Sequence, residues 1–253
     1  LGMVYEEAKA LAFHGVALMQ MSRFTEALEV FRSSQQAFEK EGNRYWIAVL
    51  DLYRADVYLE LRRYWEAHSL AAQAKQRFDA LGIASRRMLS LVILGRIALS
   101  MDDLRSARKF ADEITVITEE ERIPLLRFPY FVLLGQIAER NQDARLAEES
   151  FRLAAEDLES HQSRLQHDDL KVTFLRGRNQ VYESLVRLSL ETGKDPVESA
   201  FSWCERTKSR GLVELLSHHL PSVQLRGEQS LLRRVHRLRD ELNLQYVKVR
   251  PET

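Results

Sequence analysis

The sequence is poor in the residues that crosslink or punctuate a chain, with one Cys, five Pro and ten Gly among 253 residues. The single thiol, Cys204, excludes an internal disulfide and leaves no thiolate cluster for zinc or an iron–sulfur centre. So few turn-forming residues argue against an all-β fold, because strands joined by frequent turns need more Gly and Pro. A lone cysteine is typical of a reducing compartment, so we expect a cytoplasmic protein.

Net charge and long apolar runs are also absent. Lys plus Arg and Asp plus Glu both number 37, so no overall field attracts nucleic acid or an anionic membrane. The longest uncharged stretch near the middle, residues 128–138, is about half as long as a membrane-spanning helix. We therefore expect neither nucleic acid nor membrane as a partner. Because a helical pattern begins at once, we expect the chain to be a piece of a longer protein.

What the sequence does contain is a repeat of 40 residues. In each copy an alanine follows an apolar or aromatic residue by three positions, and a glycine or alanine stands 12 positions before it. A small residue inside a helix lowers helix stability and is kept where a neighbouring backbone approaches closely. The pattern therefore predicts two packed helices in each repeat. The two columns are Ala27, Ala67, Ala107 and Ala147, and Gly15, Ala55, Gly95 and Gly135.

Short polar breaks separate the helices predicted by these columns. Their residues are typical of helix ends, with glycine after a helix and proline at a helix start. Each repeat is therefore predicted to be helix A, turn, helix B and turn, with neighbouring repeats burying each other's apolar faces. The breaks are residues 21–23, 62–63, 101–103 and 141–143 within repeats, and 41–43, 81–82 and 123–124 between them.

The repeat resembles the tetratricopeptide repeat, which has Leu-Gly in helix A and an Ala, a Phe and an Ala in helix B. Leu134 and Gly135 match the first helix, and Ala147, Phe151 and Ala154 match the second. The usual repeat has about 34 residues, so each pair here is longer by about six. The resemblance implies an all-α, right-handed superhelical α-solenoid of helical hairpins.

Three parts of the chain follow from this pattern. Residues 1–160 hold four tetratricopeptide-like helix pairs, and residues 161–220 hold a fifth, extended pair in which Ala200 takes the alanine column. Residues 221–253 are predicted to form a C-terminal amphipathic helix that is truncated here. We favour packing of its apolar stripe on the fifth pair over dimerisation. The stripe is Leu231, Val235, Leu238 and Leu242.

The segment AFSWCERTKSRGLVELL, residues 200–216, carries a second resemblance. Together with residues 174–185, it resembles the region that links tetratricopeptide repeats to a CHAT domain, a caspase-like peptidase module found mainly in bacterial proteins. The resemblance implies a regulatory or substrate-recruiting arm whose peptidase module lies downstream. Four matching residues form either a solvated helix face or a docking surface for that downstream domain. These are Glu205, Lys208, Ser209 and Arg210.

No group of residues has the spacing of a catalytic, metal or phosphate site. Cys204 and His218 lie 14 positions apart on one expected helix, about 21 Å from each other. Cys204 instead falls in the column of Phe31 and Phe151, which predicts a buried packing thiol. The Asp102-Asp103 pair precedes an expected helix start, where helix capping explains both carboxylates. We therefore expect no enzymatic activity, no metal and no cofactor.

The tetratricopeptide resemblance also implies a site, because helix A lines a concave groove in that family. We expect the groove to bind a protein or peptide. Some members hold chaperone C-termini with a carboxylate clamp of Lys, Asn and Arg side chains. Here the clamp positions hold Ala12, Val16, Tyr53, Leu89 and Ile93, so we expect no such clamp. The expected groove residues are Tyr53, Asp56, Glu60, Arg96, Gln136 and Arg140.

We therefore expect a non-catalytic protein-binding and regulatory scaffold, the tetratricopeptide arm of a bacterial CHAT-domain protein. The alternative is the sensor arm of a bacterial transcriptional regulator, because such proteins also use long helical repeats. The reading frame beyond Thr253 separates the two. A His followed by a Cys in a strand-and-helix pattern favours the first, and a helix-turn-helix favours the second.

Overall fold

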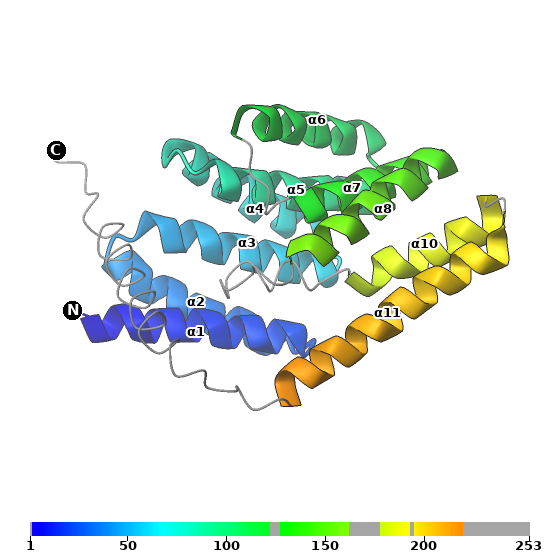
Figure 1. The fold of residues 1–253 in the computed structure, drawn as a ribbon. Coiled ribbons are helices and arrows are strands. Elements are labelled where there is room, and N and C mark those ends of the chain that lie inside the picture. Colours follow the sequence, from blue (N-terminus) through cyan, green and yellow to red (C-terminus); the bar gives the residue numbers. More distant parts are fainter. Residues whose placement is uncertain (1, 122–126, 162–177, 193–194, 220–253) are drawn as a thin grey trace. The chain divides into compact units, whose positions relative to one another are not determined.

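The computed structural model describes residues 2–121, 127–161, 178–192 and 195–219, and within them the backbone forms ten α-helices and no strand (Figure 1). The all-α fold class is confirmed. The helices are α1 (Gly2–Gln20), α2 (Phe24–Lys40), α3 (Arg44–Glu60), α4 (Tyr64–Ala80), α5 (Ala84–Ser100), α6 (Leu104–Glu121), α7 (Arg127–Arg140), α8 (Ala144–His161), α10 (Arg178–Thr192) and α11 (Pro196–His219).

Consecutive helices pack as hairpins, α1 with α2, α3 with α4, α5 with α6, and α7 with α8 (Figure 1). We call the first helix of each hairpin its A helix and the second its B helix. Each hairpin contacts the next, and the A helices α1, α3, α5 and α7 also contact one another in succession. Helix α10 packs against α8 and continues the stack. This arrangement is the α-solenoid that the repeat predicts.

The chain divides into two compact units, Leu1–Cys204 and Glu205–Thr253. Within the first unit, Tyr182 of α10 and Trp203 of α11 lie with their ring centroids 6.3 Å apart. The second unit is described only in the C-terminal part of α11. The predicted C-terminal helix at 221–253 lies outside the described residues, as does the segment 162–177 of the extended fifth pair.

The alanine column lies at the centre of each hairpin. Ala27, Ala67, Ala107 and Ala147 are all fully buried. A methyl group is large enough to exclude water there and small enough to let helix A and helix B approach closely. The burial of all four residues supports the register of the 40-residue repeat.

The glycine column was expected to allow a close approach of a neighbouring backbone. In the structure a side chain, not a backbone, lies against each of these glycines. A Cβ atom built on Gly15 would lie 2.5 Å from Cε1 of Phe31, and one built on Gly135 would lie 2.6 Å from Cε1 of Phe151. In both hairpins the phenyl ring of helix B occupies the place of the missing side chain on helix A. The glycines therefore make room for aromatic rings, which bury more apolar surface than a backbone contact does.

Aromatic rings also join the first hairpin to the second. Phe38 at the end of α2 stacks on Trp46 of α3, with centroids 5.3 Å apart and an interplanar angle of 5°. The indole Nε1 of Trp46 donates a hydrogen bond of 3.0 Å to the hydroxyl of Tyr5 in α1. Tyr45 contacts Phe78 of α4 edge-on at 6.2 Å. The first four helices thus share one ring cluster.

Polar side chains cap the starts of several helices, as expected for Asp103. Asp102, which was also expected to cap, lies instead in the turn before α6 and accepts a hydrogen bond from Arg140. Oδ1 of Asp103 accepts a hydrogen bond of 3.0 Å from the backbone N–H of Ser106, and Oδ1 of Asp143 accepts one of 3.0 Å from Leu146. Hydrogen bonding from Ser106 lowers the pKa of Asp103 below its ordinary value. Helix capping is therefore the role of Asp103.

The three-residue turns between helices place their central residue in the left-handed region. In the second hairpin, Arg62 has a φ of 57°, and the amide of Arg63 donates to the carbonyl oxygen of Tyr58 at 2.8 Å. This bond satisfies a carbonyl at the end of helix α3. The turns between repeats have Gly42 or Gly82 at this position. The turns within repeats have other residue types there, so their left-handed conformation could not be predicted from the sequence. The non-glycine residues with φ near 60° are Ser22, Arg62, Asp102 and Gln142.

The turns give a testable contrast between two substitutions. Arg62→Gly should raise the free energy of unfolding by about 1 kcal/mol, because glycine adopts the left-handed conformation without a steric penalty. Gly82→Ala should lower it by about the same amount. Urea unfolding followed by circular dichroism measures both changes. An Arg62→Gly variant that unfolds at lower urea than the parent protein would contradict the assignment.

Candidate functional site

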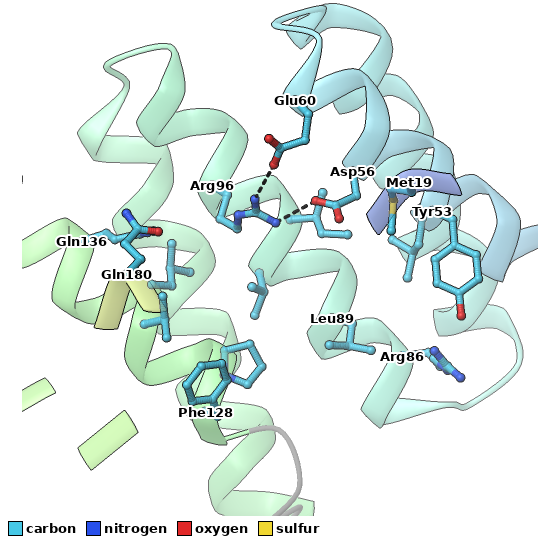
Figure 2. Close-up of a pocket in the computed structure, with 16 residues that line it drawn as sticks. Met19, Tyr53, Asp56, Glu60, Arg86, Leu89, Arg96, Phe128, Gln136 and Gln180 are labelled. Atoms are coloured by element: carbon cyan, nitrogen blue, oxygen red, sulfur yellow. Dashed lines mark hydrogen bonds and ion pairs between the residues drawn. The ribbon is translucent and has the colours of Figure 1, made fainter. Parts of the chain in front are cut away.

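A groove of about 230 Å³ crosses the A helices α3, α5 and α7, with single contributions from α1 and α10 (Figure 2). Its floor is apolar and its margins carry polar and charged groups. The apolar lining residues are Met19, Leu52, Leu89, Val92, Ile93, Phe128, Pro129, Val132 and Leu133, and the others are Tyr53, Asp56, Glu60, Arg86, Arg96, Gln136 and Gln180.

The structure brings five of the six expected groove residues together. These are Tyr53, Asp56, Glu60, Arg96 and Gln136. Arg140 lies at the end of α7 and turns to the neighbouring hairpin, where its Nη1 donates to the backbone oxygen of Leu99 and to Oδ1 of Asp102, both at 3.2 Å. Arg140 thus links α7 to the turn after α5.

Tyr53 owes its position to the glycine column. Its ring stacks on Phe31, with centroids 5.6 Å apart and an interplanar angle of 28°. Phe31 in turn fills the space above Gly15. The absence of a side chain on α1 therefore lets a ring from α2 move inward and support the tyrosine of α3 from behind.

A second glycine shapes the floor of the groove. Helix α6 has Ala111 where α2 and α8 have phenylalanine, so no ring from the B helix of this hairpin covers Gly95 of α5. Leu133 of α7 enters instead, and a Cβ atom built on Gly95 would lie 2.7 Å from its Cδ2. Leu133 is fully buried and lines the groove. This contact lets α7 approach α5 closely and closes the floor.

An ionic triad lies at one end of the groove, at the C-terminal ends of α3 and α5. Arg96 donates from Nη1 to Oδ1 of Asp56 at 2.8 Å and from Nη2 to Oε1 of Glu60 at 3.4 Å (Figure 2). Burial acts to lower the pKa of Arg96, but the two carboxylates and their hydrogen bonds hold it above its ordinary value. The guanidinium stays charged and pairs with both carboxylates.

The ion pair of Asp56 and Arg96 could have been predicted from the repeat. Asp56 and Arg96 stand 40 residues apart, so they share one column of the repeat on successive A helices. Opposite charges at equivalent positions of stacked helices are placed to pair. The side chains of Asp56, Arg96 and Glu60 are 11%, 29% and 35% exposed, so the triad borders the groove and is not sealed in the core.

Arg86 is a groove residue that sequence reasoning missed. It lies near the start of α5, is 8% exposed, and its guanidinium carbon stands 5.8 Å from the centre of the Tyr45 ring. A guanidinium over an aromatic face gains a cation–π attraction and keeps its charge. No repeat column marks this residue, because the other A helices have different residue types at its position.

The groove belongs to a helical-repeat fold that a solved structure shares. The crystal structure of BtubC (BKLC) from P. vanneervenii is similar to this chain, with a TM-score of 0.56 and 14% sequence identity. The similarity covers 88% of this chain and 92% of that chain. Neither a family model nor a curated protein matches the sequence. At this identity the likeness supports the fold alone.

The other expected docking residues lie on α11. Glu205 is half-buried, and Lys208, Ser209 and Arg210 follow it on the same helix, with side chains outside the described part. Cys204 was predicted to be buried, but it is half-exposed. On α11 the adjacent Trp203 packs against α10 instead, with its ring near that of Tyr182.

Among the described residues, no three His, Cys, Asp or Glu side chains gather in a way that could hold a metal ion. No helix in the same residues combines the length and apolar composition needed to cross a bilayer.

Proposed function

We propose that this chain is a non-catalytic scaffold that binds a segment of a partner protein in the groove across α3, α5 and α7. The observation that carries the proposal is the composition of that groove. Its apolar floor can bury side chains, and polar groups at its margin can orient a bound segment. Repeat solenoids use such extended A-helix surfaces for binding.

We also propose that the scaffold is the tetratricopeptide arm of a cytoplasmic bacterial CHAT-domain protein. The support is the segment at residues 200–216, whose residues lie on α11. In that arrangement α11 leads from the solenoid toward the downstream domain, and Glu205, Lys208, Ser209 and Arg210 take part in docking it. The reading frame beyond Thr253 tests this part, because a helix-turn-helix there would contradict it.

If the groove binds a partner protein, substitutions in its lining should abolish that binding. Replacing Asp56, Arg96 and Gln136 together by alanine should remove partners captured from a soluble extract of the source cells. The triple variant should stay folded, because the paired charges of Asp56 and Arg96 leave together, and Glu60, which loses Arg96, is 35% exposed and stays in contact with water. Affinity capture with quantitative mass spectrometry measures the loss, and circular dichroism checks the fold.

A matched control changes the same residue types on the B helices. Gln73, Arg108 and Asp112 are all exposed, on α4 and α6. Alanine at these three positions should leave the captured partners unchanged. If the folded groove variant keeps every partner that the control variant keeps, the groove is not the binding site.

A further inference from the structure

The size of the groove across α3, α5 and α7 limits the kind of segment that it fits, and this inference rests on the proposed function. Its volume is about 230 Å³, and apolar side chains such as Leu89, Val92 and Leu133 form its floor. An apolar cavity of about 150 Å³ holds a benzene molecule, so this one has room for a single large apolar side chain. A leucyl, phenyl or indole group meets this requirement.

The charged side chains of the lining are already engaged by other residues of the chain. Arg96 pairs with Asp56 at 2.8 Å and with Glu60 at 3.4 Å. The guanidinium of Arg86 lies over the ring of Tyr45. Asp56, Glu60 and Arg86 each make further interactions within the chain. A charged ligand group would lose water without gaining a free opposite charge, so the groove favours an uncharged segment.

Two uncharged polar side chains of the lining are available to a ligand. Gln136 of α7 is half-buried and Gln180 of α10 is exposed, and in Figure 2 both lie on the side of the groove away from Tyr53. Within the described part of the chain, neither carboxamide takes part in a hydrogen bond. A carboxamide offers N–H donors and a carbonyl acceptor, which match the C=O and N–H groups of a peptide main chain. An extended segment exposes both groups, whereas a helix bonds them internally.

We infer that the groove binds an extended, uncharged protein segment that inserts one large apolar side chain into the cavity and hydrogen-bonds through its main chain to Gln136 and Gln180. The cavity selects this anchor side chain by its volume, and the carboxamides bind the main chain whatever its side chains are. Recognition of this kind requires one anchor residue and no acidic or basic residue at a fixed spacing from it.

Selection of peptides from a random 12-residue library displayed on phage tests the inference on the intact chain. Bound peptides should be enriched in Leu, Phe or Trp at one position, with no enrichment in charged residues beside it. Two substitutions of Val132, which is half-buried and lines the groove, test the cavity. Val132→Phe fills the cavity and should remove binding, whereas Val132→Ala enlarges it and should shift the selected anchor toward Trp.

The carboxamides are tested with a selected synthetic peptide and with copies of it that are each N-methylated at one main-chain amide. Gln136→Ala should weaken the unmodified peptide about fivefold in fluorescence polarisation, which corresponds to about 1 kcal/mol. One methylated copy should bind about as weakly, because it lacks the donor that Gln136 accepts, and Gln136→Ala should not weaken that copy further. The matched control is Gln76→Ala, which should leave the affinity unchanged because Gln76 is exposed on α4 outside the groove lining. Circular dichroism checks that each variant is folded.

The outcomes separate this inference from the proposed function. If the folded chain selects no peptide, or only peptides that also bind the variant in which Asp56, Arg96 and Gln136 are replaced by alanine, the groove is not a segment-binding site and both fail. If groove-dependent peptides need a charged residue, lack the anchor or bind equally well after methylation of every amide, the proposed function stands and this inference is overturned. An uncharged anchor that is lost in Val132→Phe, together with coupling between Gln136 and one main-chain amide, supports both.

Discussion

Replacing Ala107 by arginine should lower the free energy of unfolding by at least about 3 kcal/mol. The Ala107 side chain is fully buried between α5 and α6. Overpacking of such a site costs about 1 to 3 kcal/mol, and burial of an unpaired guanidinium adds to the loss. Thermal and urea unfolding followed by circular dichroism would show the effect as a large drop in midpoint or as an unfolded chain.

The control is the same substitution at an exposed alanine inside a helix. Ala17 in α1 is exposed, so Ala17→Arg should change stability by less than about 0.5 kcal/mol. Equal stability of the Ala107→Arg variant and the parent protein would show that the 40-residue register is wrong.

The second large effect is expected in the fourth hairpin. There the effect of Gly135→Ala on the free energy of unfolding should change sign with the residue at position 151. In the parent chain Gly135→Ala should destabilise by about 1 kcal/mol, because the new Cβ atom would lie 2.6 Å from Phe151. Phe151→Ala alone should cost about 3 to 5 kcal/mol, since it empties a buried ring site. With alanine at 151, Gly135→Ala should instead stabilise by about 1 kcal/mol through helix propensity.

A double-mutant cycle in urea measures this sign change. The second hairpin already uses the alanine pair, because Ala55 and Ala71 occupy the two positions and both are fully buried. A coupling energy near zero between positions 135 and 151 would show that Gly135 is not needed to make room for the Phe151 ring.

The fold could be predicted because its signal repeats. Any single alanine in a helical pattern is ambiguous, but Ala27, Ala67, Ala107 and Ala147 repeat without a slip, and each is buried. The turns were predicted in place but not in conformation. Left-handed residues are recognised in a sequence mainly as glycine, and Arg62 adopts that conformation because its turn is fixed by the helices on both sides.

The groove could be predicted only in part, because its position follows from the repeat while its contacts depend on differences between repeats. Asp56 and Arg96 were expected to line it, and they do, but their ion pair was not foreseen. Leu133 reaches Gly95 only because the third B helix lacks a phenyl ring. Arg86 occupies a position where the other repeats have Glu6, Trp46 and Leu126, three unlike residues. Contacts of this kind arise between unlike copies, and periodicity alone does not reveal them.

The ring cluster of the first two hairpins has a consequence for spectroscopy. Trp46 is 4% exposed within the cluster, Trp65 is 78% exposed, and Trp203 sits half-buried against Tyr182 near the other end of the first unit. Solenoids unfold through partly folded states, because each repeat is stabilised mainly by its neighbours. The indole emission of Trp46 and that of Trp203 would therefore shift at different denaturant concentrations, and variants that keep only one of them would report which end of the stack opens first.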